Sequence, residues 1–278
     1  MIPLTVLAAA VVTAVVLVSI RAFASHGEPL DAERPEQWLV AHSPGWMRRG
    51  LQATDRRVAG GVAVAVAFAT LFGCALLVGW IFSTIDDGSG IARWDEAAAE
   101  FGARNATETS TTILKAITRL GATVPLLIAM ALIGAYHGLR RNDWRPATYL
   151  VVVGIGISLL NNVVKLIVDR ERPDIARLSG HSGSSFPSGH SASAAACWAA
   201  IMLILARKQP TSTRWFASFV AVLVAASVAT TRVLLGVHWV SDVVAGVVVG
   251  WSWFFVVTVT FGGRLLRFGD PAQRIAGR

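Results

Sequence analysis

Long uncharged apolar segments constrain the fold of this chain more than any other feature of its sequence. A helix that crosses a lipid bilayer needs about 17–25 predominantly apolar residues. Because backbone groups cannot remain unpaired in lipid, helices are the expected structure for runs of this length. Seven runs without Asp, Glu, Lys or Arg reach that length: Ile2–Ile20, Val58–Phe82, Leu120–Leu139, Pro146–Val164, Phe186–Ala206, Trp215–Thr231 and Val243–Gly263. The sequence therefore predicts an all-α fold, a polytopic transmembrane helical bundle with a six-helix core and an additional N-terminal transmembrane helix.

The composition supports a membrane protein and argues against a nucleic-acid partner. Only 15% of the residues are charged, against about 25% in soluble domains. The net charge is +8, but the basic residues fall in short connections between apolar runs rather than on one basic face. The two cysteines, Cys74 and Cys197, lie inside apolar runs, where packing is a more typical role than a disulfide or a metal site. The expected partner is the bilayer, with no nucleic acid.

The chain divides at the edges of the six-span core. Residues 1–57 are expected to be an N-terminal membrane anchor and a cytoplasmic amphipathic linker, residues 58–263 the core, and residues 264–278 a cytoplasmic basic tail. A cleaved signal peptide is the alternative for the first run, but no positive charge precedes this run and Arg21 follows it. For residues 21–57, a helix on the membrane surface and a solvated linker both remain open.

The distribution of Lys and Arg predicts the orientation of the core. One set of connections, 21–57, 140–145, 207–214 and the tail, holds 16 of the 25 basic residues. The opposite set holds the other 9 and 10 of the 17 acids. Cytoplasmic loops are enriched in Lys and Arg. The first set is therefore expected in the cytoplasm and the second set outside.

Three clusters of polar residues lie at the ends of these runs. They are KLIVDRERPD at 165–174, FPSGHS at 186–191 and TRVLLGVHWVSD at 231–242. The predicted topology puts all three clusters on the outer side of the membrane. With one apolar run more or fewer between them, the clusters would not share a face. We therefore expect a single polar site at the extracytoplasmic face of the cell membrane.

The first cluster offers two cations with a defined spacing. Lys165 and Arg172 are seven residues apart, or two helical turns, so both side chains can point the same way. Pro173 restricts Arg172 to an extended conformation. Such a pair suits an anion with several oxygens. The alternative is that each side chain simply reaches for water at the membrane boundary.

The second cluster is typical of a helix N-terminus. Pro187 is expected in the first helical turn, while Ser188 and Gly189 supply a hydroxyl and an unobstructed backbone N–H. A helix N-terminus binds anions through its N–H groups and its dipole. His190 would lie in the same turn and could donate a proton to the bound group. A capped helix with an incidental histidine is the alternative.

The third cluster contains a paired imidazole. His238 and Asp242 are four residues apart, so they are expected to face each other on one helix. The carboxylate would hold one ring nitrogen protonated and leave the other with its lone pair, as a nucleophilic imidazole requires. Arg232 adds a third cation. An ion pair at the membrane boundary is the alternative.

Taken together, the clusters describe a site for phosphoryl transfer. Cations offset the charge on the phosphoryl oxygens, one imidazole attacks, and the other protonates the leaving oxygen. The sequence contains no HExxH, carboxylate cluster or Walker loop.

The clusters resemble the signature of the type-2 phosphatidic acid phosphatase superfamily, which also includes vanadium haloperoxidases. Its pattern is K-x6-RP, PSGH and SR-x5-H-x3-D, and this chain matches it at every position but one. Thr231 replaces the Ser that begins the third motif and keeps a hydroxyl. The resemblance spans roughly residues 58–262. His181 matches no motif position and is interpreted as solvated.

The resemblance implies a role for each motif residue. The histidine at position 238 becomes phosphorylated, Asp242 orients it, and His190 protonates the leaving group. No metal or other cofactor is required. The residues implied to bind the phosphate oxygens are Lys165, Arg172, Ser188, Gly189 and Arg232.

The predicted function is an integral membrane lipid phosphatase that acts at the outer leaflet. Two other hypotheses are a catalytically inactive lipid-binding or transport protein of the same fold and a vanadate-dependent haloperoxidase. The sequence does not determine the oligomeric state or the lipid. Undecaprenyl diphosphate, phosphatidylglycerol phosphate, phosphatidic acid and phosphorylated prenyl-sugar carriers are all compatible with it.

Overall fold

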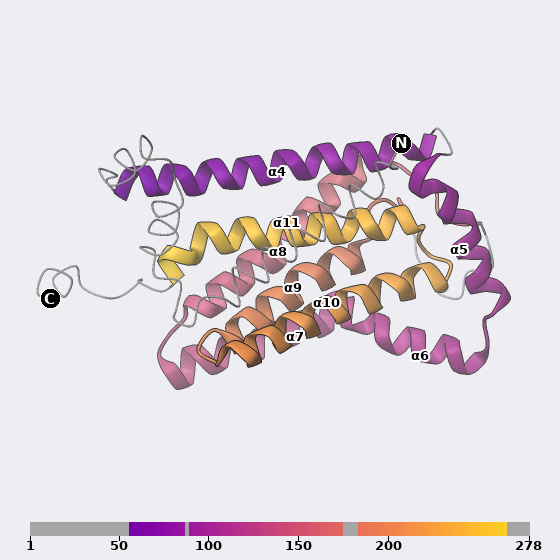
Figure 1. Cartoon of the computed structure of the whole chain (residues 1–278). Coiled ribbons are helices and arrows are strands. Elements are labelled where there is room, and N and C mark those ends of the chain that lie inside the picture. The colour runs from indigo at the N-terminus through magenta and orange to yellow at the C-terminus, as the bar shows by residue number, and fades with distance from the viewer. Residues whose placement is uncertain (1–55, 87–88, 175–182, 266–278) are drawn as a thin grey trace, which may run out of the picture.

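Helices form every regular element that the structure describes. The computed structural model describes residues 56–86, 89–174 and 183–265, and the all-α prediction is confirmed for these ranges (Figure 1). The predicted anchor and linker, His181 and nearly all of the basic tail lie outside them. In chain order the helices are α4 (Arg56–Asp86), η1 (Gly90–Ala92), α5 (Arg93–Arg104), α6 (Glu108–Thr118), η2 (Arg119–Gly121), α7 (Thr123–Ala135), η3 (Tyr136–Arg140), α8 (Arg145–Ile167), α9 (Gly189–Ala206), α10 (Thr211–Leu234) and α11 (Val240–Leu265).

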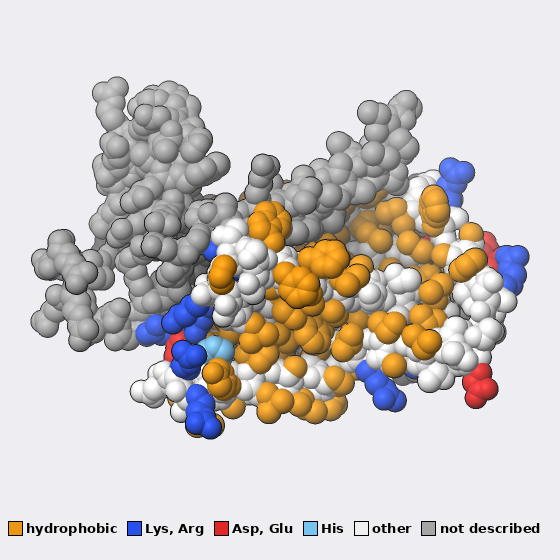
Figure 2. All heavy atoms as spheres, turned by 60° about the horizontal axis from the view of Figure 1, so that its bottom comes forward, with side chains coloured by type: hydrophobic (Ala, Val, Ile, Leu, Met, Phe, Trp, Pro, Cys, Tyr) orange, Lys and Arg blue, Asp and Glu red, His pale blue; other side chains and the backbone are white. Residues whose placement is uncertain are grey.

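The long helices confirm a multi-pass membrane protein. Within the described ranges, five segments are long and apolar enough to cross a bilayer: Thr123–Arg140, Arg145–Ile167, Gly189–Ala206, Thr211–Leu234 and Val240–Phe261. A sixth candidate combines Ala69–Ile85 with Gly90–Arg104, which meet at 53°. Apolar side chains cover the middle of the face seen in Figure 2, and charged side chains gather toward its two ends. This distribution is the one expected of helices that span a hydrocarbon layer.

Helix α9 is the centre of the bundle and contacts α8, α10 and α11, while α4 lies along α11 (Figure 1). The inward face of α9 is built largely from alanine. Small side chains let helix backbones approach closely, which is how helices associate within a membrane. The fully buried alanines of α9 are Ala192, Ala194, Ala195, Ala196 and Ala200.

Two glycines of α11 complete this close approach. A Cβ atom on Gly246 would lie 2.5 Å from the Ser188 carbonyl oxygen, and one on Gly250 would lie 2.4 Å from the Ala192 oxygen. Only glycine fits at such distances. The two glycines are four residues apart and form a GxxxG surface on α11. They hold the start of α9 against the first turns of α11, so the second and third polar clusters meet.

The connection 83–119 contains two amphipathic helices. Helices α5 and α6 lie at one end of the bundle (Figure 1) and pack against α10, and α5 also contacts α11. The buried residues of α5, Asp95, Ala99 and Gly102, share one helical face. A carboxylate on this packed face requires polar partners in the protein.

Candidate active site

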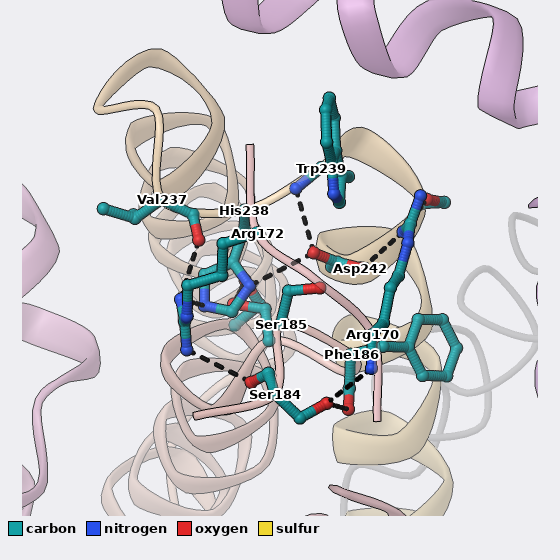
Figure 3. A network of polar contacts seen from close by, with 12 residues as sticks. Arg170, Arg172, Ser184, Ser185, Phe186, Val237, His238, Trp239 and Asp242 are labelled. Carbon is teal, nitrogen blue, oxygen red and sulfur yellow. Dashed lines mark hydrogen bonds and ion pairs between the residues drawn. The ribbon is translucent and has the colours of Figure 1, made fainter. Parts of the chain in front are cut away.

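The structure brings the three predicted clusters together at the end of the bundle next to α5. The Ser188 N–H donates to the Asp242 carbonyl oxygen over 3.0 Å, which joins the second cluster to the third. Arg172 Nη1 lies 3.3 Å from His238 Nε2, which joins the first cluster to the third. Figure 3 shows Arg172 beside His238 and Arg170 beside Asp242.

The first cluster differs from its predicted geometry. Helix α8 ends at Ile167, so Lys165 lies in its last turn and Arg172 follows in a non-helical segment. The helical spacing of the two cations is therefore not realised, whereas the non-helical backbone at Arg172 agrees with the effect expected of Pro173. They meet nevertheless, because Lys165 Nζ donates to the Ser184 carbonyl oxygen over 2.8 Å and Arg172 Nη2 donates to the same oxygen over 3.2 Å. Both cations therefore donate to the same backbone carbonyl oxygen.

The second cluster begins a helix two residues later than predicted. Ser188 is the N-cap residue of α9, and Gly189 is its first residue. Pro187 therefore precedes the cap instead of occupying the first turn. His190 lies in the first turn and is partly buried, as expected. The hydroxyl of Ser188 accepts a hydrogen bond from Ser191 Oγ over 2.9 Å, so it is not used as a helix cap.

The third cluster has the predicted contact without the predicted helix. Helix α11 begins at Val240, so Asp242 lies in its first turn and His238 lies before it. The placement of both residues on one helix is wrong. Asp242 Oδ2 accepts from the Trp239 backbone N–H over 2.9 Å and contacts His238 Nδ1 over 3.3 Å. The carboxylate thus satisfies a backbone N–H at the start of α11 and reaches the imidazole from there.

The surroundings of His238 define its tautomer. A guanidinium has only donors, so the contact from Arg172 Nη1 makes Nε2 the acceptor and leaves the ring proton on Nδ1, toward Asp242. Burial lowers the pKa of His238 to about 4; the hydrogen bond and charge of Asp242 oppose this shift, and the charges of Arg232 and Arg172 add to it. The imidazole is therefore neutral near pH 7, with a lone pair on Nε2.

Arg232 is the most completely buried of the predicted cations. It lies in the last turn of α10 and is 1% exposed. Its Nη1 donates to Thr118 Oγ1 at the end of α6 over 3.2 Å. The preceding Thr231, which replaces the motif serine, donates its hydroxyl to the Val228 carbonyl oxygen over 2.6 Å. The substitution is therefore accommodated by a local bond to the helix backbone.

The site also contains three polar residues to which the sequence analysis gave no role: Arg170, Ser241 and Asp95. Arg170 donates to Asp242 Oδ1 over 2.6 Å, to Ser241 Oγ over 2.7 Å and to Asp95 Oδ2 over 2.9 Å. Asp95 is 3% exposed and comes from α5, 75 residues before Arg170. The helical spacing of Asp95 with Ala99 was the one available signal, because it puts the carboxylate on a packed face. Its partners could not be read from the sequence.

The part of the chain described by the structure contains no group of three or more His, Cys, Asp and Glu side chains arranged to hold a metal ion. The expectation that the reaction needs no metal stays a prediction, and chelation tests it directly.

The fold and the site define a multi-pass membrane protein in which cationic side chains and a histidine paired with an aspartate lie at one end of a helical bundle. The profile of the PAP2 superfamily matches residues 146–265. Phosphatidylglycerophosphatase B of Bacillus subtilis is 37% identical over 158 residues, which cover 56% of this chain and 77% of that protein. The chain therefore belongs to the PAP2 superfamily, the type-2 phosphatidic acid phosphatase superfamily that the motifs predicted.

Other relatives are also named as phosphatases of lipid phosphates. Lipid A 1-phosphatase of Rhizobium johnstonii is 37% identical over 120 residues, covering 40% of this chain and 45% of that protein. Decaprenylphosphoryl-5-phosphoribose phosphatase of Mycobacterium tuberculosis is 33% identical over 142 residues, covering 49% and 72%. These relatives confirm the predicted enzyme class, a phosphatase.

A crystal structure supports the fold. The transmembrane PAP2 type phosphatidylglycerolphosphate phosphatase from Bacillus subtilis superimposes with a TM-score of 0.63 at 31% identity. The match covers 67% of this chain and 93% of that chain. The bundle described above is thus shared over nearly the whole length of a solved membrane phosphatase.

Proposed function

We propose that this protein removes a phosphate from a lipid phosphomonoester or diphosphate through a phosphohistidine intermediate on His238, at the extracytoplasmic face of the cell membrane. The observation that carries this proposal is the environment of His238. The ring is buried, holds its proton on the side of Asp242, and directs Nε2 toward Arg172. A neutral imidazole oriented in this way is a nucleophile beside a cation that can bind phosphoryl oxygens.

The first half of the reaction transfers the phosphoryl group to the enzyme. Nε2 of His238 forms a bond to phosphorus while the bond from phosphorus to the lipid oxygen breaks. The leaving oxygen takes a proton from His190 and departs as an alcohol, or as a lipid monophosphate when the substrate is a diphosphate. Lys165, Arg172 and Arg232 offset the charge on the phosphoryl oxygens.

The second half regenerates the enzyme. His190, now neutral, accepts a proton from a water molecule that attacks phosphorus. The bond between phosphorus and Nε2 breaks, inorganic phosphate leaves, and His238 returns to its neutral state. The N–H of Gly189 and the hydroxyl of Ser188, at the start of α9, are assigned to the phosphate oxygens. The dipole of α9 favours negative charge at this position.

Two observations support the substrate class and the side of the membrane. The relatives are named for phosphatidylglycerophosphate, lipid A and decaprenylphosphoryl-5-phosphoribose, which share a phosphate on a lipid. The distribution of Lys and Arg favours an outer position for the connections that carry the site. A site where the long helices end can receive a phosphate headgroup while the lipid chains stay in the bilayer.

The His238→Ala variant tests the proposal. Purified wild-type protein is expected to release phosphate from at least one of phosphatidylglycerol phosphate, phosphatidic acid and undecaprenyl diphosphate in mixed micelles. The His238→Ala variant is expected to release none, because the nucleophile is lost. His137→Ala is the matched control, since His137 is also buried but belongs to η3, outside the three clusters. Near wild-type activity of His238→Ala, with His137→Ala equally active, would reject the assigned nucleophile.

A further inference from the structure

Arg170 forms a bridge between two buried carboxylates from distant parts of the chain. One Nη atom donates to Asp242, the other donates to Asp95, and the guanidinium lies 5.5 Å from the centre of the Trp239 ring. Figure 3 shows Arg170 on the side of Asp242 away from His238. The side chains of Asp95 and Asp242 are 5% and 0% exposed. The bridge therefore lies directly behind the pair formed by Asp242 and His238.

Asp95 is held firmly enough to orient its partners. Its Oδ1 accepts from the Ser241 N–H over 2.9 Å, and its Oδ2 accepts from Ser241 Oγ over 2.6 Å as well as from Arg170. Helix α5, which carries it, is tightly packed, because a Cβ atom on Gly102 would lie 2.6 Å from the Leu234 carbonyl oxygen. The carboxylate thus links α5 to the start of α11, where Asp242 lies.

Asp242 needs this bridge to hold a single orientation. Its Oδ2 is bound by the Trp239 N–H and His238, which lie in the same stretch of chain, whereas Oδ1 has Arg170 as its donor. Contacts to one oxygen leave the carboxylate able to rotate about its Cβ–Cγ bond, and the contact from Arg170 to the other oxygen prevents that rotation. Arg170 is itself a long flexible side chain, and Asp95 keeps it in place.

The charges of the bridge are also suited to the paired imidazole. A guanidinium paired with Asp242 alone would neutralise the carboxylate that His238 uses. Shared between Asp242 and Asp95, the single positive charge faces two negative charges, and one negative charge remains in excess. Such a group continues to attract the Nδ1 proton of His238 when the ring gains positive charge on phosphorylation.

We propose that Asp95 and Arg170 are positioning residues for the phosphoryl transfer, acting through Asp242 on His238. This inference rests on the proposed function and extends it to a residue of α5, outside the segment matched by the family profile. It assigns a role in the reaction to the connection 83–119. Neither residue touches the reacting atoms, so both should affect the rate of the chemical step more than the affinity for the substrate.

The Asp95→Asn variant is the first test, with Glu96→Gln as its matched control. Glu96 is the next residue in the same helical turn and is exposed, so both changes remove one carboxylate from the start of α5. Asp95→Asn is expected to lower kcat about 10- to 100-fold, the scale of a small misplacement of reacting groups. The KM is expected to stay within about twofold, and Glu96→Gln should match the wild type. An unchanged kcat in folded Asp95→Asn protein would overturn the inference.

A double variant separates positioning from a general structural role. If Asp95 acts through Asp242, the combination of Asp95→Asn with Asp242→Asn should be no slower than Asp242→Asn alone, because coupled residues are not additive. Multiplication of the two losses would contradict this pathway. Single-turnover formation of phosphohistidine is the measured step, since it reports directly on the nucleophile.

Arg170→Lys covers the case in which Asp95→Asn does not fold. Lysine keeps the positive charge but cannot span both carboxylates as a planar guanidinium does. It is expected to lower kcat at least tenfold at an unfolding temperature near that of the wild type, and wild-type kcat would overturn the inference. Absence of activity in the wild type on every lipid phosphate would instead reject the proposed function. Activity that depends on His238 but not on Asp95 or Arg170 would reject only the positioning roles.

Discussion

The Asp242→Asn change should expose how the site sets the tautomer of His238. Asp242 accepts from three donors: Arg170 Nη1 on Oδ1, and the Trp239 N–H and His238 Nδ1 on Oδ2. An asparagine has one acceptor oxygen and one NH₂ donor in the same place. Whichever way the amide turns, its NH₂ group faces a donor. At least one buried donor therefore loses its acceptor, which costs about 1–3 kcal/mol of stability for each such donor.

The catalytic loss should exceed the loss of stability. If the amide oxygen pairs with Arg170, its NH₂ group faces His238 and favours a lone pair on Nδ1, which moves the ring proton to Nε2 and blocks attack. If the amide turns the other way, its NH₂ group takes the place of Oδ1, which lies 2.6 Å from Arg170 Nη1 in the wild type. Two donor groups then face each other. The same change in the triad of serine proteases lowers kcat about 10⁴-fold by imposing the wrong tautomer. We expect a loss of about 10³- to 10⁴-fold here, or about 4–5.5 kcal/mol of activation free energy.

Single-turnover kinetics in detergent micelles provide the assay. The measured quantity is the rate of phosphohistidine formation from a radiolabelled lipid phosphate, with the unfolding temperature recorded for each variant. Asp169→Asn is the control, because Asp169 is an exposed acid next to Arg170 in the chain. A folded Asp242→Asn protein that transfers phosphate within about tenfold of the wild-type rate would refute the proposed control of the tautomer.

Two further predictions concern pH and metal ions. The pKa of His238, about 4 when folded, lies below its usual value of about 6.5, so the unfolded state binds more protons between these values and stability is lost as the pH falls through this window. Relative to a His238→Asn variant, the wild type should lose about 3 kcal/mol of unfolding free energy between pH 6.5 and pH 4. If the unfolding free energies of the two proteins, measured by chemical unfolding, changed equally with pH, the conclusion that His238 is buried and neutral would be wrong. Phosphate release should persist in excess EDTA, because the proposed mechanism uses protein cations on the phosphoryl oxygens. Loss of activity that added divalent metal restores would count against it.

The sequence predicted the membrane-spanning core well because each span is a local property. A run such as Pro146–Val164 is apolar over the length of a bilayer whatever its neighbours are, and helix α8 covers it. The helix ends were harder to predict. Lys165 and Arg172 have a helical spacing, but α8 ends between them at Ile167. His238 and Asp242 also have a helical spacing, and the helix starts between them.

The pairing of residues across the bundle could not be predicted from sequence. The bond between Ser188 and Asp242 depends on the approach of α9 and α11 that Gly246 and Gly250 allow. Asp95 shows the same limit, since its contact with Arg170 crosses 75 positions of sequence. A helical spacing can put a carboxylate on a packed face, but it does not indicate which helix packs there.

The sequence by itself therefore determined the class of fold and the motifs, and it predicted that the three polar clusters lie on one face of the membrane. It could do so because the length, polarity and number of the spans are local features, and the number of spans decides the side on which each connection lies. The tertiary structure decided where each helix begins and ends, which tautomer His238 adopts, and that α5 supplies Asp95 to the site. These depend on contacts between distant helices, whose geometry arises from packing of the whole bundle.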